Sequence, residues 1–275
     1  MRPRLEWTVL AAVVVPVAAT GCGGAQPTAV ALPDAAHAIG VAPDFAGTLW
    51  VTTGSRPWRS QDGGTSWQPV RGKGGGLGIA FTEIGGEVVG AEGGQRGDYG
   101  GKGLLAPRRT PTTFVSIATP YHRTDRLYAV DLFGHPWLSV DAGAHWHRLR
   151  AARLPSTALA VGAVRGDVLE PDIVYMACGD DGLWRSLDDG ATFTHMPAPA
   201  TATAIATTTD DQRRILVAGR DAVYLSTDFG RTFLPVLHRT VDAVAFDPRN
   251  RRLAYAAVGR TLLRSVDGGE TWPAS

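Results

Sequence analysis

The chain has almost no excess of either charge. Its 275 residues include 27 lysines and arginines against 26 aspartates and glutamates, and lysine itself occurs only at Lys73 and Lys102. Without Arg2, Arg4 and Glu6 the rest of the chain is formally neutral. Nucleic acid is bound through an excess of basic side chains, so this balance argues against a nucleic-acid partner.

Cysteine is nearly absent as well. Of the two cysteines, Cys22 ends a leader-like N-terminal segment, which leaves Cys178 as the only thiol for the rest of the chain. We therefore expect no internal disulfide. Cys178 follows an apolar run, and we interpret it as a small buried residue.

Helical periodicity of useful length is missing, and so is any apolar run long enough to span a bilayer comfortably. The longest such run near the N-terminus, Val9 to Val15, follows the charged residues Arg2 and Arg4. A charged start followed by a short apolar stretch is typical of a signal peptide.

Small residues stand directly before the first cysteine, in the order Ala18-Ala19-Thr20-Gly21-Cys22. This order resembles a bacterial lipobox, although Ala19 stands where leucine is usual. The resemblance implies that residues 1–21 are a lipoprotein signal peptide and that Cys22 is acylated, which would anchor the protein to the outer face of the cell membrane. A secreted protein cleaved after Ala19 is the alternative.

One phrase, Ser-x-Asp-x-Gly-x-(Thr/Ser/His)-(Trp/Phe), occurs five times, and we call it the box. Successive copies begin 79, 47, 40 and 39 residues apart. A period near 40 indicates stacked supersecondary units that bury a core only together. The copies are Ser60–Trp67, Ser139–Trp146, Ser186–Phe193, Ser226–Phe233 and Ser265–Trp272.

Each box follows one short apolar run and precedes another, so it is predicted to form a β-hairpin turn. The aspartate of such a turn can accept hydrogen bonds from backbone N–H groups, and the glycine can adopt a positive φ. Calcium binding is the functional alternative, but the closing glutamate of an EF-hand loop is missing. We interpret the five aspartates as structural: Asp62, Asp141, Asp188, Asp228 and Asp267.

The boxes resemble the Asp boxes, or BNR repeats, of sialidase-type β-propellers over residues 36–275. His145 stands where threonine is usual and is the largest departure. Before each box lie a small-residue strand and a stronger apolar strand, and a sixth set without a full box lies between the first two copies. The resemblance implies an all-β, six-bladed propeller of four-stranded antiparallel blades. The expected second strands are Leu49–Thr52, Glu87–Gly90, Leu127–Val130, Ile173–Ala177, Ile215–Ala218 and Leu253–Ala257.

Three details of this expected ring are specific to the chain. Residues 22–35 form a tether in which Thr28–Leu32 is placed to supply the edge strand that the C-terminus lacks. The eroded second unit is expected to keep a box remnant at Gly97-Asp98-Tyr99-Gly100. One aromatic position recurs in the second strands, and we interpret it as packing: it is occupied by Trp50, Tyr128, Tyr175 and Tyr255.

Candidate ligand-binding residues fall on the face opposite the boxes. Arginines from four units, Arg56, Arg96, Arg220 and Arg260, could meet around an anion such as a carboxylate or phosphate. The glycine-rich loop of the second unit is unusually long and adds Glu92, Asp98 and Tyr99. We expect this loop to cover the channel mouth and to help bind a ligand.

The sialidase motif set is not evident, because the Arg-Ile-Pro sequence before the first box is absent. The sequence therefore favours a non-catalytic, monomeric platform for an envelope protein, peptide or glycan, with no cofactor. A sialidase-type glycoside hydrolase and an assembly factor for a membrane complex remain as alternatives. His145 and His147 lie on one side of a strand, but no third metal ligand is evident.

Overall fold

The computed structural model describes most of the chain from residue 26 onward. The described residues are 26–42, 46–70, 79–81, 87–90, 95–98, 105–107, 110–120, 125–151, 153–155, 158–164, 171–197, 199–208 and 214–274. For the strands between residues 79 and 107, and for residues 163–164, only the backbone is described. Among these ranges, no helix is long and apolar enough to cross a membrane. The expected signal peptide and Cys22 lie outside them.

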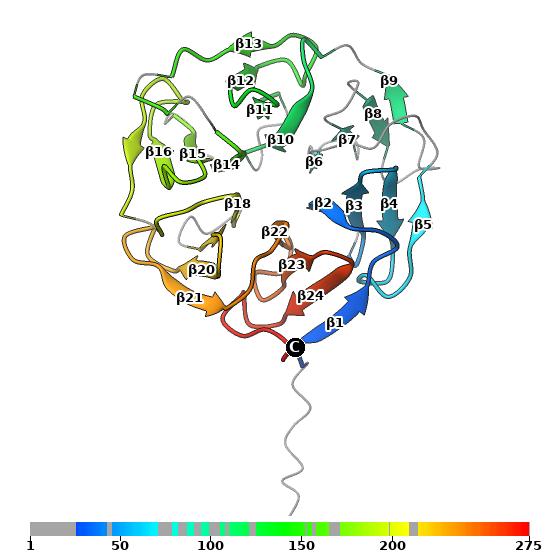
Figure 1. The fold of residues 1–275 in the computed structure, drawn as a ribbon. Coiled ribbons are helices and arrows are strands. Elements are labelled where there is room, and N and C mark those ends of the chain that lie inside the picture. Colours follow the sequence, from blue (N-terminus) through cyan, green and yellow to red (C-terminus); the bar gives the residue numbers. More distant parts are fainter. Residues whose placement is uncertain are drawn as a thin grey trace, which may run out of the picture.

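The described strands pair into six four-stranded antiparallel sheets, arranged in a ring around a central axis (Figure 1). We number the sheets in chain order. Sheet 1 contains β2 (Ala36–Val41), β3 (Leu49–Thr53), β4 (Pro57–Ser60) and β5 (Gln68–Pro69), and sheet 2 contains β6 (Ile79–Phe81), β7 (Glu87–Gly90), β8 (Gln95–Asp98) and β9 (Leu105–Pro107). Sheet 3 contains β10 (Phe114–Ala118), β11 (Leu127–Asp131), β12 (Pro136–Ser139) and β13 (His147–Arg148).

The other half of the ring repeats this order. Sheet 4 contains β14 (Ala160–Val164), β15 (Ile173–Ala177), β16 (Leu183–Ser186) and β17 (Thr194–His195). Sheet 5 contains β18 (Ala204–Thr207), β19 (Ile215–Ala218), β20 (Val223–Ser226) and β21 (Leu234–Leu237). Sheet 6 contains β22 (Ala243–Phe246), β23 (Ala254–Val258), β24 (Thr261–Ser265) and, as its outer strand, β1 (Thr28–Ala31).

The expectation of six blades of one kind needs correction at sheet 2. Five sheets carry a box and are described with their side chains, so the described residues contain five complete blades. Sheet 2 is described only by its backbone pairing and carries no box. The expected box remnant is wrong in part, because Gly97 and Asp98 pair with Val88 and Glu87 inside β8 and do not form a turn.

The ring is closed by the N-terminal strand, as the sequence predicted for Thr28–Leu32. β1 runs antiparallel to β24, with Thr28 opposite Arg264 and Ala31 opposite Thr261. The Leu32 amide then donates to the Arg260 carbonyl at 2.8 Å. Leu32 itself is 3% exposed and belongs to the core shared by sheets 6 and 1. The first and last segments of the chain therefore form one sheet.

The apolar core lies between neighbouring sheets. One cluster joins side chains of sheets 3 and 4, another those of sheets 4 and 5, and a third those of sheets 5 and 6. The recurring aromatic position is packing, as predicted: Trp50, Tyr128, Tyr175 and Tyr255 are at most 1% exposed. A further cluster lies within sheet 3 and includes Phe114 and Leu127. Most of the described core is thus formed where one unit buries its apolar face against the next.

The box is a turn held together from within. Ser60 Oγ accepts a hydrogen bond from the Gly64 amide at 2.8 Å, and Asp62 Oδ1 accepts one from the Ser66 amide at 2.9 Å. Asp62 Oδ2 accepts the Ser66 hydroxyl at 2.6 Å. The same pattern recurs in the other four boxes, so each of the five aspartates accepts hydrogen bonds within its own turn.

His145 preserves the box although it replaces threonine. Its amide donates to Asp141 Oδ1 at 2.8 Å, and its Nδ1 lies 2.6 Å from Asp141 Oδ2, in the place of the usual hydroxyl. These bonds to His145, first the backbone one and then the side-chain one, hold the pKa of Asp141 at about 2. Imidazole and hydroxyl donors are thus interchangeable at this position.

Candidate functional site

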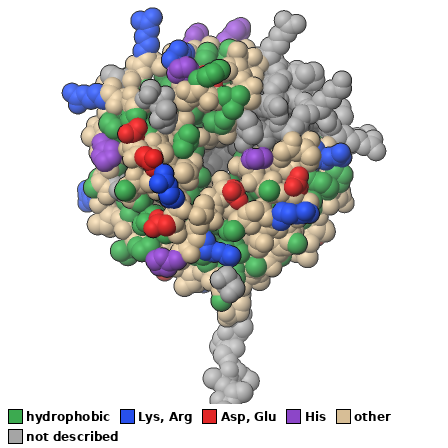
Figure 2. Space-filling view, viewed as in Figure 1, with side chains coloured by type: hydrophobic (Ala, Val, Ile, Leu, Met, Phe, Trp, Pro, Cys, Tyr) green, Lys and Arg blue, Asp and Glu red, His purple; other side chains and the backbone are tan. Residues whose placement is uncertain are grey.

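The two faces of the ring differ in their loops. The box face carries the five boxes and the turns between first and second strands. The loop face carries the turns between second and third strands and the connections from sheet to sheet. Figure 2 shows the loop face, where acidic and basic side chains lie next to one another over sheets 4 and 5 and hydrophobic side chains gather over sheet 3.

Three of the candidate arginines lie on the loop face, where the sequence placed them. Arg56 is exposed in the turn between β3 and β4. Arg220 Nη2 donates to Asp180 Oδ1 at 2.6 Å, and both side chains are about three-quarters exposed. Arg260 Nη2 donates to the Pro33 carbonyl at 2.7 Å. Two of the three guanidinium groups are thus engaged within the protein, so a shared anion would have to compete with those contacts.

The remaining candidates belong to the second unit. Glu92 and Tyr99 lie outside the described residues, as does most of the glycine-rich loop. Arg96 and Asp98 lie in β8, where only the backbone is described. Their role in ligand binding therefore stays a prediction from the sequence.

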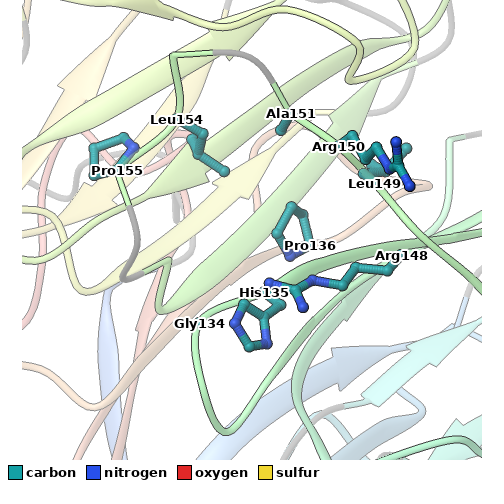
Figure 3. Close-up of a pocket in the computed structure, with 9 residues that line it drawn as sticks. All are labelled: Gly134, His135, Pro136, Arg148, Leu149, Arg150, Ala151, Leu154 and Pro155. Carbon is teal, nitrogen blue, oxygen red and sulfur yellow. The ribbon is translucent and has the colours of Figure 1, made fainter.

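A groove described with its side chains lies on the loop face between sheets 3 and 4 (Figure 3). Its cavity measures about 610 Å³. One wall is the turn between β11 and β12, and the other is the connection that leads from β13 to β14. The lining residues are Gly134, His135, Pro136, Arg148, Leu149, Arg150, Ala151, Leu154 and Pro155.

The first wall of the groove is pinned by a buried carboxylate. Asp131, which is 2% exposed, ends β11. Its Oδ1 accepts the amides of Phe133 and His135, each at 2.9 Å. Its Oδ2 accepts Trp137 Nε1 at 2.9 Å and lies 3.2 Å from His135 Nδ1. A carboxylate that accepts bonds from both sides of a turn fixes the turn before any ligand arrives.

The bonds around Asp131 also fix its charge. Burial alone would raise the pKa of this carboxyl, but the hydrogen bonds from His135, Trp137 and Phe133 outweigh burial and lower the pKa. Because the ionised carboxylate has no proton to give, His135 donates through Nδ1 and keeps Nε2 available on the groove side. The ring therefore presents a defined edge to the cavity.

Apolar side chains stand at the rim of the same wall. Leu132 is 56% exposed and Phe133 is 71% exposed, and both project from the pinned turn. The Phe133 ring lies 6.2 Å from the His135 ring, centroid to centroid. Large apolar side chains that are exposed together on a rigid turn are typical of an interaction site.

The groove is positively charged and has an apolar floor. Arg148 and Arg150 are exposed along the connection from sheet 3, and the residues that line the cavity include no carboxylate. Leu149 and Leu154 pack against the core between sheets 3 and 4. An elongated ligand with carboxylates and apolar side chains matches this arrangement, because guanidinium groups bind carboxylates through paired hydrogen bonds.

A second, smaller cavity of about 130 Å³ lies in the central channel. It is lined by the first strands of five sheets, among them Ser116, Ala160 and Ala204, with His37 and Asp242 at its loop-face end. Small side chains are required here because the inner strands converge. Among the described residues, no group of three or more His, Cys, Asp or Glu is placed to hold a metal ion.

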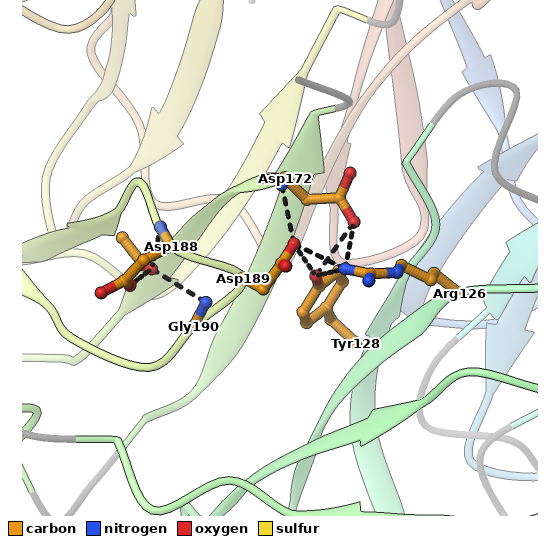
Figure 4. A network of polar contacts seen from close by, with 7 residues as sticks. Arg126, Tyr128, Asp172, Asp188, Asp189 and Gly190 are labelled. Atoms are coloured by element: carbon orange, nitrogen blue, oxygen red, sulfur yellow. Dashed lines mark hydrogen bonds and ion pairs between the residues drawn. The ribbon is translucent and has the colours of Figure 1, made fainter. Parts of the chain in front are cut away.

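The box face has its own polar network between sheets 3 and 4 (Figure 4). Arg126 Nη1 lies 2.5 Å from Asp189 Oδ1 and 3.3 Å from Asp172 Oδ2. Tyr128 donates its hydroxyl to Asp172 Oδ2 at 3.0 Å. Burial, and then the two nearby carboxylates, raise the pKa of Tyr128, so it stays a protonated donor. This network ties two sheets together and lies on the opposite face from the groove.

Comparison with known proteins supports the fold and little more. No protein-family model matches the chain, and no curated protein matches its sequence. Among solved structures, it is similar to a GH74 xyloglucanase from Xanthomonas campestris at 23% identity, with a TM-score of 0.56, over 84% of this chain and 37% of that one. The chain therefore spans little more than a third of that enzyme.

Two other similar structures match over nearly their whole length. "YCF48 bound to D1 peptide" is 16% identical, with a TM-score of 0.51, over 89% of this chain and 98% of that one. U3-55K is 11% identical, with a TM-score of 0.61, over 85% of this chain and 96% of that one. At these identities the likeness shows the fold alone, and the class it defines is the β-propeller.

Proposed function

We propose that the protein is a non-catalytic binding propeller whose groove between sheets 3 and 4 takes an acidic peptide segment of another protein. The observation that carries the proposal is the groove itself: basic side chains and an apolar floor lie beside a turn that Asp131 holds in place. A rigid site loses little conformational entropy when a ligand binds.

The composition of the groove also favours binding over hydrolysis. Glycoside hydrolases normally use a pair of carboxyl groups that flank the bond to be broken. The cavity is lined by His135 and two arginines and by no carboxylate. The GH74 xyloglucanase shows that this fold can be part of a hydrolase, whereas YCF48 bound to D1 peptide shows that it can also hold a peptide.

Peptide binding can be tested with a dye-labelled peptide of alternating leucine and glutamate residues, followed by fluorescence anisotropy. We expect the dissociation constant to rise about tenfold or more when glutamine replaces glutamate, because charge-assisted hydrogen bonds are lost. The double variant Arg148→Ala, Arg150→Ala should show a similar loss. Phe133→Ala should weaken binding through lost apolar contact.

The matched control is Arg56→Ala, which removes an exposed arginine from the same face outside the groove. It should leave the dissociation constant unchanged. If the Arg56 variant weakens binding and the groove variant does not, the anion site predicted from the sequence is favoured instead. Equal binding of both peptides to all variants would contradict the proposal.

We also propose that the chain is an extracytoplasmic lipoprotein of the Asp-box type, anchored through Cys22. The support is the order of charged residues, apolar stretch and small residues before Cys22, together with five boxes whose turns have the expected bonds. Metabolic labelling with a palmitate analogue tests the anchor: the wild-type chain should be labelled and the Cys22→Ser variant should not. A labelled Cys22→Ser variant would exclude this acylation site.

A further inference from the structure

The N-terminal strand leaves the ring on the box face. Thr28 pairs with Arg264, one residue before Ser265, where β24 ends and the last box begins. Gln26, the first described residue, therefore lies on the box-face side of sheet 6. Any anchor that precedes it in the chain must reach the protein from this side.

The distance from this corner to the anchor is short. Cys22 precedes Gln26 by four residues, and four extended residues span at most about 14 Å. Exposed charges interact over a Debye length of about 8 to 10 Å at physiological ionic strength. Charged side chains around the start of β1 would therefore lie close enough to a lipid surface to interact with its headgroups.

The exposed charge at this corner is mainly basic. The turn between β22 and β23 lies on the box face of sheet 6 and exposes Arg249, Arg251 and Arg252. Arg231 is exposed in the box of the neighbouring sheet 5. Of the carboxylates nearby, Asp247 is 7% exposed, and Glu270 Oε1 lies 2.7 Å from Arg214 Nη2.

Among the residues that the structure describes at this corner, the other carboxylates belong to the boxes of sheets 5 and 6; Asp210 and Asp211, in the turn between β18 and β19, lie outside the described residues. Asp228 Oδ1 accepts the Thr232 amide and Asp267 Oδ1 accepts the Thr271 amide, each at 2.9 Å. The carboxylates of Asp228 and Asp267 are thus hydrogen-bonded within their own turns. The resulting surface matches an anionic partner.

Apolar side chains project from the same face. The variable positions of three boxes expose Val140 by 48%, Leu187 by 58% and Phe229 by 37%. Phe229 has a positive φ of 62°, as do the residues at the same position of the other four boxes: Gly63, Ala142, Asp189 and Gly268. The box turn therefore sets this backbone conformation, and Phe229 is the only large apolar residue among the five.

We propose that the box face around sheets 5 and 6 rests on an anionic phospholipid membrane, with Arg231, Arg249, Arg251 and Arg252 at the headgroup phosphates and Phe229 at the interface. The groove on the loop face then points away from the membrane, toward other proteins. This inference rests on the lipid anchor proposed above. Basic side chains near an anionic leaflet each strengthen membrane association by about fivefold.

Hydrogen exchange of the full chain bound to vesicles tests this orientation. We expect the amides of residues 249–252 to exchange at least about fivefold more slowly on phosphatidylglycerol vesicles than on phosphatidylcholine vesicles. The turn at residues 132–135 should exchange equally on both. The double variant Arg231→Glu, Arg252→Glu should abolish the difference, and Phe229→Gly should reduce it while relieving backbone strain.

The matched control is Arg148→Glu, Arg150→Glu, which makes the same charge change on the loop face. It should keep the lipid-dependent protection and lose peptide binding. Equal exchange on the two lipids, or protection of residues 132–135, would overturn the proposed orientation. Failure of the chain to sediment with phosphatidylcholine vesicles would instead count against the lipid anchor, because the lipid-dependent difference is measured separately.

Discussion

Asp131 offers the sharpest test of how the groove is built. Replacement by alanine removes the side-chain acceptor of four hydrogen bonds in the β11–β12 turn and leaves its backbone bonds in place. Each hydrogen bond to a charged acceptor contributes about 1.5–3 kcal/mol net to the free energy of unfolding. Water can replace the lost acceptor for the two amides and for His135 once the turn loosens, so the losses do not add in full. We therefore expect Asp131→Ala to lower the free energy of unfolding by about 3 kcal/mol.

Replacement of Asp131 by asparagine should cost less. The amide oxygen can still accept the two backbone bonds, and neutral His135 can accept from the new amide group, so mainly the Trp137 bond is lost. We expect a loss of about 1–2 kcal/mol in the free energy of unfolding. Both variants should also bind the acidic peptide more weakly, because only the fraction of molecules with an ordered turn is competent to bind.

Urea denaturation followed by far-ultraviolet circular dichroism measures the stability, and anisotropy measures the binding. Asp180→Ala is the control, because Asp180 is exposed and its ion pair with Arg220 is a surface one. It should change stability by less than about 0.5 kcal/mol. If Asp131→Ala changes stability no more than this control, the turn is not held by the carboxylate and the reasoning about a preformed groove is wrong.

Three further predictions concern the ring. Ser186→Ala removes the acceptor of the Gly190 amide, at 2.9 Å, and should lower the free energy of unfolding by about 1–2 kcal/mol in urea denaturation; an unchanged midpoint would contradict the role given to the box serine. Three box aspartates have a pKa of about 2 in the folded protein, because hydrogen bonds hold it below the ordinary value of 3.8: Asp62, Asp141 and Asp228. A lowered folded pKa stabilises the protein above the unfolded value, so the melting temperature should fall as pH drops from about 4 to 2; a flat profile there would refute the linkage. Burial raises the pKa of Cys178 to about 12, so this thiol should react with a disulfide reagent only after unfolding; rapid reaction of the folded protein would exclude a buried thiol.

The sequence predicted the parts of the fold that depend on local repetition. The box turns, the recurring aromatic position and the closing strand at Thr28–Leu32 were all evident, because each depends on spacing along the chain. The second unit was harder to predict, because its glycine-rich segment carries little hydrophobic pattern. The expected remnant at Gly97-Asp98 lies in a strand. A short motif that lacks the closing Trp or Phe of the box does not specify a turn.

The groove was not predicted, because it depends on contacts between two sheets. The pairing of His135 with Asp131 and the position of His135 opposite Arg148 follow only from the assembled ring. One signal was available. The corresponding turns of the other described sheets are polar, whereas the turn between β11 and β12 carries Leu132 and Phe133.

The closing strand β1 also has a consequence for biogenesis. Ala31 pairs with Thr261, 230 residues further along the chain, so this sheet can be completed only after all the intervening residues have been made. Contacts so distant in sequence form slowly, because the entropy of closing a very long loop is lost before the contacts stabilise the fold. Until then both edges of the unfinished ring are open to pairing with other chains. Dependence on a chaperone during folding is the expected consequence of this topology.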